Sequence, residues 1–307
     1  MTRNLEILIS MPNDQSSLRV AHAEAIMNVL ELEVHRWKEL WFYSEIGVLG
    51  FPRDLSKANS LTKLSISAGI IDEDAIKLIG PTLHNVPGAL RVLNLDGVDF
   101  DGLYLFGRRY PMHLDHLERL TLQYDGWIQG ILNILSDVQN SLISADIHVE
   151  GQWSHSTEYH SLASYNPHIS LTTLRYLKLW IYDANLDLFD YLEMSSLMVV
   201  DLSVNWTTIP EYARSIAPLI GFIINRSPSL RTCTMKFDGL PTDWGTMAFR
   251  SPAIMRLRTY KFYNVALGSV TREEIAKSAP FSIITRIRFI AEDIPLRFTI
   301  GWDEDDN

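Results

Sequence analysis

The sequence predicts an α/β fold, an irregular right-handed solenoid with parallel strands on its concave face and helices on its convex face. The pattern Leu-x-x-Leu-x-Leu occurs three times, beginning at Leu90, Leu117 and Leu174. These starts lie 27 and 57 residues apart, about one and two periods of 28, and a period of roughly 20–29 residues is typical of leucine-rich repeats. A strand, a turn, a helix and a return at this period place successive strands side by side and parallel, with right-handed crossovers.

A relaxed template, which accepts any large apolar residue at the three leucine positions, extends the repeat along the chain. Its ten starts are Trp37, Leu61, Leu90, Leu117, Leu142, Leu174, Leu197, Leu230, Leu257 and Ile284. The apolar first, fourth and sixth positions of each repeat are expected in the core. Because side chains alternate along a strand, the third, fifth and seventh positions, which flank the fourth and sixth, are expected on the outward face. Leu142 starts the weakest copy, since Ala145 fills its second leucine position. Leu93, Leu120 and Leu177 are predicted to be fully buried.

The repeats divide the chain into three parts. Residues 1–36 contain a short strand at Leu5–Ile9 and a helix with Ser17 as its N-cap, and they are expected to cover the first edge of the solenoid. Residues 37–296 form about ten leucine-rich-repeat-like units, and residues 297–307 form an acidic tail that is expected not to pack. Helices of the convex side are predicted at 72–79, 127–138 and 211–225, and after the capping-box spelling at Thr271–Glu274.

Composition restricts the environment and the classes of partner. The net charge of -10 argues against general affinity for nucleic acid, because most of the surface would repel a polyanion. A single cysteine, Cys233, excludes an internal disulfide and a zinc site built from cysteines. The first residues lack the apolar region of a signal peptide, and no apolar run is long enough to span a membrane. We therefore expect a cytoplasmic or nuclear protein with no membrane contact.

The sequence contains no catalytic or cofactor-binding motif that we can identify. Gly-x-Ser-x-Gly, a phosphate-binding Gly-Lys-Ser/Thr loop and Gly-x-Gly-x-x-Gly are all absent. The strongest metal candidate is a histidine-rich insertion over residues 148–168. Its possible ligands are His148, Glu150, His155, Glu158, His160 and His168. A polar loop seldom brings ligands to one point, so we predict no metal and no cofactor, with a metal-dependent or hydrolytic enzyme at this insertion as the alternative.

Part of the sequence resembles a known family. The segments Met11–Asp14, Ala21–Leu30 and Val34–Leu40, the last reading Val-His-Arg-Trp-Lys-Glu-Leu, are similar to F-box proteins of mushroom-forming (basidiomycete) fungi. In that family such a strand follows a helix and leads into irregular leucine-rich repeats. The resemblance implies a non-enzymatic region that recognises substrates for a ubiquitin ligase. Nothing before Met11 matches the F-box itself, so we expect no binding to the family's Skp-type adaptor.

Aromatic and basic residues at outward template positions are the predicted partner contacts, because aromatic residues and arginine are enriched in protein interfaces. These positions are Trp41, Tyr43, Tyr176, Lys178, Trp180, Lys236, Lys261, Tyr263, Arg286 and Arg288. The bases among them favour a protein partner that is locally acidic or phosphorylated. RNA is a weaker candidate, since the acidic remainder of the chain would oppose it. A slip of the register by one residue would exchange the outward set for the buried one.

Overall fold

The structure is a computed structural model. The chain divides into two compact units, Met1–Glu150 and Gly151–Asn307. The described residues are 5–11, 25–44, 52, 54–68, 86, 88–96, 114–125, 128–150, 168–182, 189, 191–205, 226–238, 259–263, 286–290 and 297–301. Beyond residue 234 only the backbone is described.

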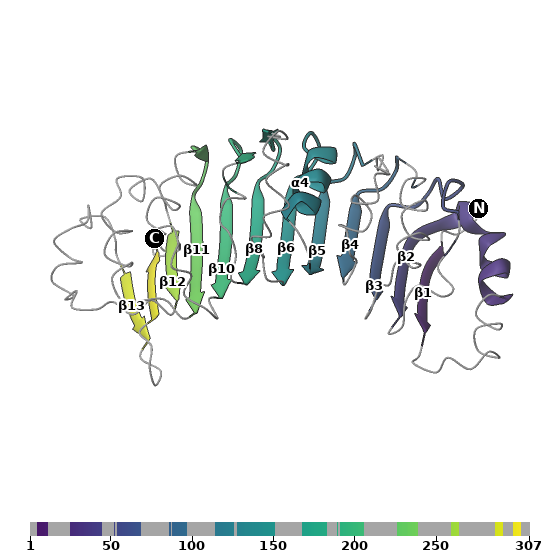
Figure 1. Cartoon of the computed structure of the whole chain (residues 1–307), viewed down its shortest axis with the longest axis horizontal. Coiled ribbons are helices and arrows are strands. Elements are labelled where there is room, and N and C mark those ends of the chain that lie inside the picture. Colours follow the sequence, from purple (N-terminus) through teal and green to yellow (C-terminus); the bar gives the residue numbers. More distant parts are fainter. Residues whose placement is uncertain are drawn as a thin grey trace, which may run out of the picture. The chain divides into compact units, whose positions relative to one another are not determined.

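The first unit is a parallel sheet whose strands follow chain order (Figure 1). Its strands are β1 (Leu5–Met11), β2 (Trp37–Ser44), β3 (Lys63–Ala68), β4 (Val92–Asp96), β5 (Arg119–Asp125) and β6 (Ser144–Glu150). A helical segment over residues 25–31 and the short 3₁₀ turn η1 (Val34–Arg36) precede β2. The helix α4 (Ile128–Asp137) connects β5 to β6 and lies over one face of these strands in Figure 1.

The strand registers of the first unit align the leucine positions of successive repeats. Leu40, Leu64, Leu93, Leu120 and Ala145 are partners in consecutive strand pairs. All five side chains are buried, with at most 1% of their surface exposed. The predicted register is confirmed, including the weak copy at Leu142, which is itself fully buried. The alternative of a one-residue slip is wrong, because it would have placed this row of leucines on the exposed side.

Several repeats enter their strands through the same backbone hydrogen bonds. The N–H of the first template leucine donates to the carbonyl three residues earlier, as Leu61 does to Ala58 (2.8 Å) and Leu117 to Leu114 (2.8 Å), whereas Leu142 donates to Val138, four residues earlier. The carbonyl of the second template residue then accepts from the next repeat, so that the Arg91 oxygen receives the N–H groups of both Glu118 and Arg119. Ala58 and Leu114 are buried. The structure therefore adds a core position that the template did not include.

The second unit repeats this arrangement over its first strands. The parallel strands β8 (Tyr176–Tyr182), β10 (Val199–Asn205), β11 (Thr232–Asp238) and β12 (Thr259–Tyr263) are neighbours in that order. Leu177, Val200, Cys233 and Tyr260 align across them. Two short strands, β7 (Ile169–Ser170) and β9 (Leu192–Glu193), pair in parallel in a separate sheet just before β8 and β10.

The end of the second unit differs from the expected repeat. The tenth repeat provides β13 (Arg286–Ile290), but its strand neighbour is β14 (Arg297–Gly301), which pairs antiparallel with both β12 and β13. A parallel return needs a crossover of a dozen or more residues, whereas only residues 291–296 separate β13 from β14. The parallel order therefore ends at β12. The tail expected to begin at residue 297 instead begins with a strand.

The expected helices can be compared only in part. The helix predicted at 127–138 is confirmed as α4, and the strand predicted at Leu5–Ile9 as β1. The segments 72–79 and 211–225, the capping box at Thr271–Glu274 and the N-cap at Ser17 lie outside the described residues. Among the residues that the structure describes, no helix has the length and apolar character needed to cross a membrane.

Candidate protein-interaction face

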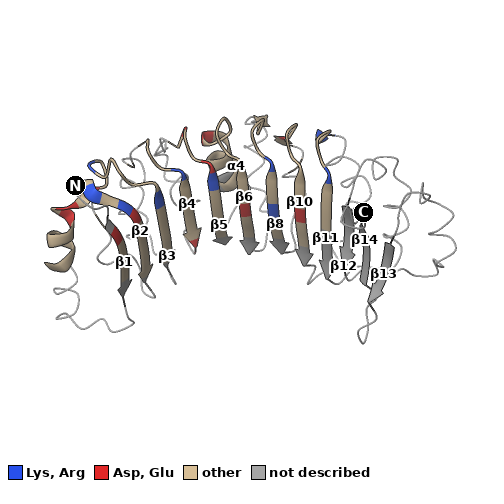
Figure 2. Cartoon of the chain, turned by 180° about the vertical axis from the view of Figure 1, so that it is seen from behind, with Lys and Arg blue, Asp and Glu red and all other residues tan. Residues whose placement is uncertain are grey.

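One side of the sheet is exposed in both units, and we call it the exposed face. It consists of the third, fifth and seventh template positions, which point away from the buried leucines. In Figure 2, which views the chain from behind, β5 and β6 lie in front of α4, so α4 covers the other side of these two strands. Parallel sheets are usually covered on both faces. In the described part of the chain every side chain at these outward positions is half-buried or exposed, and this face is therefore the feature that a function has to explain.

In the first unit an aromatic patch lies on β1 and β2. Leu8 is opposite Trp41 in the register, and Tyr43 follows two residues along. The exposed fractions are 74% for Leu8 and 43% for Tyr43, and Trp41 is half-buried. The Lys63 ammonium lies 4.7 Å from the centroid of the Trp41 ring and 3.8 Å from the Glu39 carboxylate. The lysine thus holds the indole in place, while its charge is offset by Glu39.

Polar side chains bridge the neighbouring strands β3 and β4 on the same face. The Asn94 amide donates to the Ser65 hydroxyl at 2.9 Å, and the Ser67 hydroxyl donates to the Asp96 carboxylate at 2.8 Å. These residues are only partly buried, so each bond competes with water and adds little to stability. Their effect is to hold these side chains of β3 and β4 in fixed positions beside the aromatic patch.

In the second unit the exposed face carries aromatic and basic residues on β8. Tyr176, Lys178 and Trp180 alternate with the buried Leu177 and Leu179 along this strand. Trp180 is 37% exposed, Lys178 is exposed and Tyr176 is half-buried. Two arginines beside this surface, Arg175 and Arg231, occupy the second template position of their repeats and are exposed. Figure 2 shows basic residues on β8 and at the start of β11.

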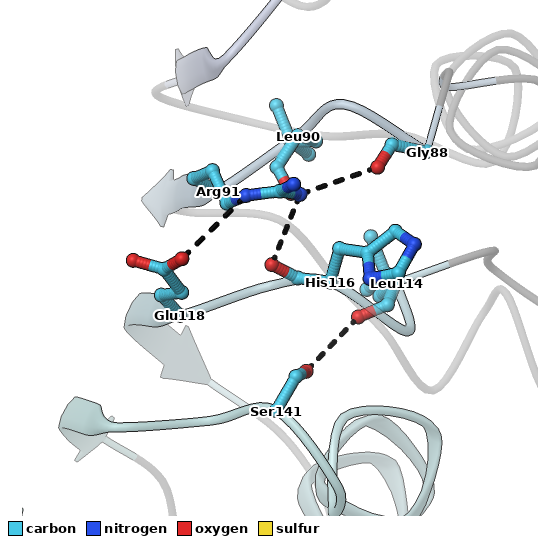
Figure 3. Close-up of polar contacts among 7 residues, drawn as sticks. All are labelled: Gly88, Leu90, Arg91, Leu114, His116, Glu118 and Ser141. Atoms are coloured by element: carbon cyan, nitrogen blue, oxygen red, sulfur yellow. Dashed lines mark hydrogen bonds and ion pairs between the residues drawn. The ribbon is translucent and has the colours of Figure 1, made fainter.

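A cluster of polar contacts joins the turns at the strand starts of the first unit (Figure 3). One nitrogen of the Arg91 guanidinium, Nη1, lies 3.2 Å from the carbonyl of Gly88 and 3.3 Å from that of His116. Arg91 Nε also lies 3.5 Å from the Glu118 carboxylate. Arg91 is therefore a structural link between two repeats. Sequence reasoning missed it, because the contacts depend on how neighbouring turns stack and no local motif encodes them.

The predicted partner residues that are described in full all lie on the exposed face. These are Trp41, Tyr43, Tyr176, Lys178 and Trp180. The side chains of the remaining predictions, Lys236, Lys261, Tyr263, Arg286 and Arg288, lie outside the described part, although their strands are described. The structure adds Leu8, Arg175 and Arg231 to the exposed set. Leu8 belongs to β1, which the template did not cover, and the two arginines occupy a template position that the outward set omitted.

The described residues contain no group of three or more histidine, cysteine or acidic side chains that could hold a metal ion. Most of the histidine-rich insertion, residues 151–167, lies outside the described part of the chain. Cys233 is fully buried, and burial raises the pKa of its thiol, with a smaller contribution from the negative charge of Asp201. Its thiol therefore stays protonated, and a buried protonated thiol is a poor nucleophile.

Comparison with known proteins leaves these surfaces as the basis for a functional argument. No protein-family model matches the chain, and the search of curated proteins returned no match. The described structure defines an α/β protein whose parallel sheet has one buried face and one exposed face.

Proposed function

We propose that this chain is a non-enzymatic protein-interaction module that binds its partner through the exposed face of the sheet. In this proposal the two units belong to a leucine-rich-repeat-like solenoid, whose concave side is the exposed face. The observation that carries the proposal is the position of Trp41, Tyr43 and Trp180 on an uncovered sheet face rather than in the core. Repeat proteins of this kind use extended concave surfaces for binding.

The energetic argument concerns large apolar groups in contact with water. Burial of apolar surface stabilises by about 25 cal/mol per Å², and a tryptophan or tyrosine has some 150–250 Å² available. A chain under selection for folding alone would place such residues inwards, as it does with Trp37 and Phe42 on β2, which are 0% and 1% exposed. Trp41 and Tyr43 lie on the opposite side of the same strand. Their position favours contact with a partner.

The resemblance to basidiomycete F-box proteins suggests which kind of partner this is. By that resemblance the module would recognise a protein substrate for ubiquitin transfer, in the cytoplasm or the nucleus. The partner, rather than the module, would then undergo the chemistry.

The proposal can be tested with a random-peptide display library selected against the purified full chain. Peptides that bind the wild type are then measured against the variant Trp41→Ala, Tyr43→Ala, Tyr176→Ala, Trp180→Ala. We expect affinity to fall at least about tenfold, because aromatic anchors dominate interface energetics. The matched control is Ile26→Ala, Val29→Ala, Leu32→Ala, which removes exposed apolar side chains of the helical segment at residues 25–31 and of the turn that follows it.

The control variant is expected to bind as the wild type does. Failure to select any peptide, or equal binding by the aromatic variant at unchanged thermal stability, would contradict the proposed function.

A further inference from the structure

Basic side chains dominate the described surface of the second unit, although the chain as a whole carries a net charge of -10. Its fully described residues include the bases Arg175, Lys178, Arg226 and Arg231, against the acids Glu193 and Asp201. The first unit has the opposite balance, with six bases and ten acids among the side chains that are described there. The described side chains of the second unit therefore carry a local excess of positive charge, and its sign favours an anionic ligand at that part of the surface.

The repeat geometry places two of these bases at a fixed separation. Arg175 precedes β8 and Arg231 precedes β11, and both occupy the second template position of their repeats. Met198 occupies that position in the repeat between them, and its N–H donates to the Arg175 carbonyl while its own carbonyl accepts from Arg231, each at 2.9 Å. The two arginine backbones are thus two strand spacings apart, about 9.6 Å. Both side chains are exposed at the same edge of the sheet.

Aromatic side chains complete this surface. Lys178 lies between Tyr176 and Trp180 along the exposed side of β8. The surface combines cations that can pair with carboxylates and flat apolar groups that can cover an adjacent side chain. We call Arg175, Tyr176, Lys178, Trp180 and Arg231 the β8 surface.

We propose that the β8 surface binds an acidic segment of a partner protein, presenting two carboxylates or phosphates about 10 Å apart, one for each arginine. This inference rests on the proposed function and specifies its partner. A protein segment fits better than RNA because Asp201 is directly opposite Lys178 in the strand register. The sugar-phosphate backbone of RNA carries a negative charge at every nucleotide and would be repelled by Asp201. A peptide can place a neutral residue opposite Asp201.

The first unit supplies the contrast that locates the site. Its bases Lys63 and Arg91 lie beside the carboxylates of Glu39 and Glu118, at 3.8 and 3.5 Å. Among the described ion pairs none involves Arg175 or Arg231. Their guanidinium groups are therefore the ones best placed to exchange water for a partner's anionic groups, since no internal contact has to be broken first.

The test is a charge reversal, Arg175→Glu, Lys178→Glu, Arg231→Glu, compared with the wild type in the same peptide-display selection. The control variant reverses three exposed bases of the first unit, Lys38→Glu, Lys57→Glu and Arg119→Glu, and so changes the net charge equally. We expect wild type and control to enrich Asp- and Glu-rich peptides. The reversed variant should bind those peptides at least about tenfold more weakly, and it should enrich Lys- and Arg-rich peptides instead.

Each outcome of the selection distinguishes this inference from the function on which it rests. Peptides without an acidic bias, or acidic peptides that bind the reversed variant unchanged, would overturn the inference and leave the interaction module intact. If no peptide is selected at all, the proposed function itself fails. A labelled single-stranded RNA is titrated in parallel, and tighter binding of RNA than of the acidic peptides, lost in the reversed variant, would also overturn the inference.

Discussion

The two units share a core but differ on their exposed faces. The central core row holds Leu64, Leu93 and Leu120 in the first unit, and Leu177 and Val200 in the second, all buried. The first unit links Lys63 to Glu39 and Ser67 to Asp96 across strands, whereas the second carries aromatic residues beside Lys178 and exposes Arg175 and Arg231 at its strand starts. Stacking constrains the buried positions of every repeat in the same way. The exposed positions are under no such constraint, and this is where the units differ.

The largest expected effect tests the shared core. Leu120→Ala and Leu177→Ala should each lower the free energy of unfolding by about 2–5 kcal/mol, because each leaves a cavity in a row of packed side chains. Thr121→Ala and Lys178→Ala, on the exposed face beside them, should cost less than about 0.5 kcal/mol. Urea denaturation followed by circular dichroism measures all four. Equal losses at neighbouring positions would mean that the two faces are not distinguished as described.

A second experiment probes Cys233, one of the positions in the core row of the second unit that another residue occupies in place of leucine. Cys233→Ser puts a hydroxyl into an apolar site and should cost about 1–3 kcal/mol, more than Cys233→Ala if no hydrogen-bond acceptor is within reach. The wild-type thiol, buried and with a raised pKa, should not react with a thiol-specific dye until urea unfolds the chain. Rapid labelling of the folded protein at neutral pH would place Cys233 outside the core.

Arginines at the second template position should have different roles in the two units, stability in the first and binding in the second. Arg91→Ala should cost about 1 kcal/mol, since Arg91 bonds to two turns but its side chain is 40% exposed and screened by water. Arg91→Lys should recover little, because an ammonium cannot reproduce the fork of a guanidinium. Arg175→Ala, at the matching position, should leave the thermal midpoint unchanged while weakening binding of acidic peptides. If Arg175→Ala lowered the thermal midpoint and Arg91→Ala weakened peptide binding, the roles assigned to these two residues would be wrong.

The smallest effect concerns a turn before β3. The Ser56 hydroxyl and its backbone N–H, the latter at 2.8 Å, donate to Asp54 and hold the pKa of that carboxyl below its usual 3.8. A lowered folded-state pKa contributes stability that is complete above pH 3.8 and is lost as the pH falls through the folded value. Asp54→Asn should therefore be slightly less stable than the wild type at neutral pH and equal to it in strong acid. Thermal midpoints across this pH range provide the check.

Much of the fold could be predicted because the pattern of apolar residues that specifies it is repeated along the chain. The even spacing of apolar positions fixed which residues of β2 to β6 are buried, even where Ala145 replaces a leucine. The same alternation identified Trp41, Tyr43, Tyr176, Lys178 and Trp180 as outward residues. The antiparallel β14 was not predicted, since five residues of mixed character carry no periodic signal and the strand gains its partners only from β12 and β13.

The sequence by itself determined the period, the strand register and the division of residues between buried and exposed faces, because these depend on local alternation repeated along the chain. Only the tertiary structure decided which charges neutralise each other. Lys63 meets Glu39 and Trp41, and Arg91 meets Glu118 and the turn at His116, through contacts between residues about 25 positions apart. Such contacts depend on how one repeat stacks on the next, and that stacking leaves Arg175 and Arg231 exposed at the starts of β8 and β11.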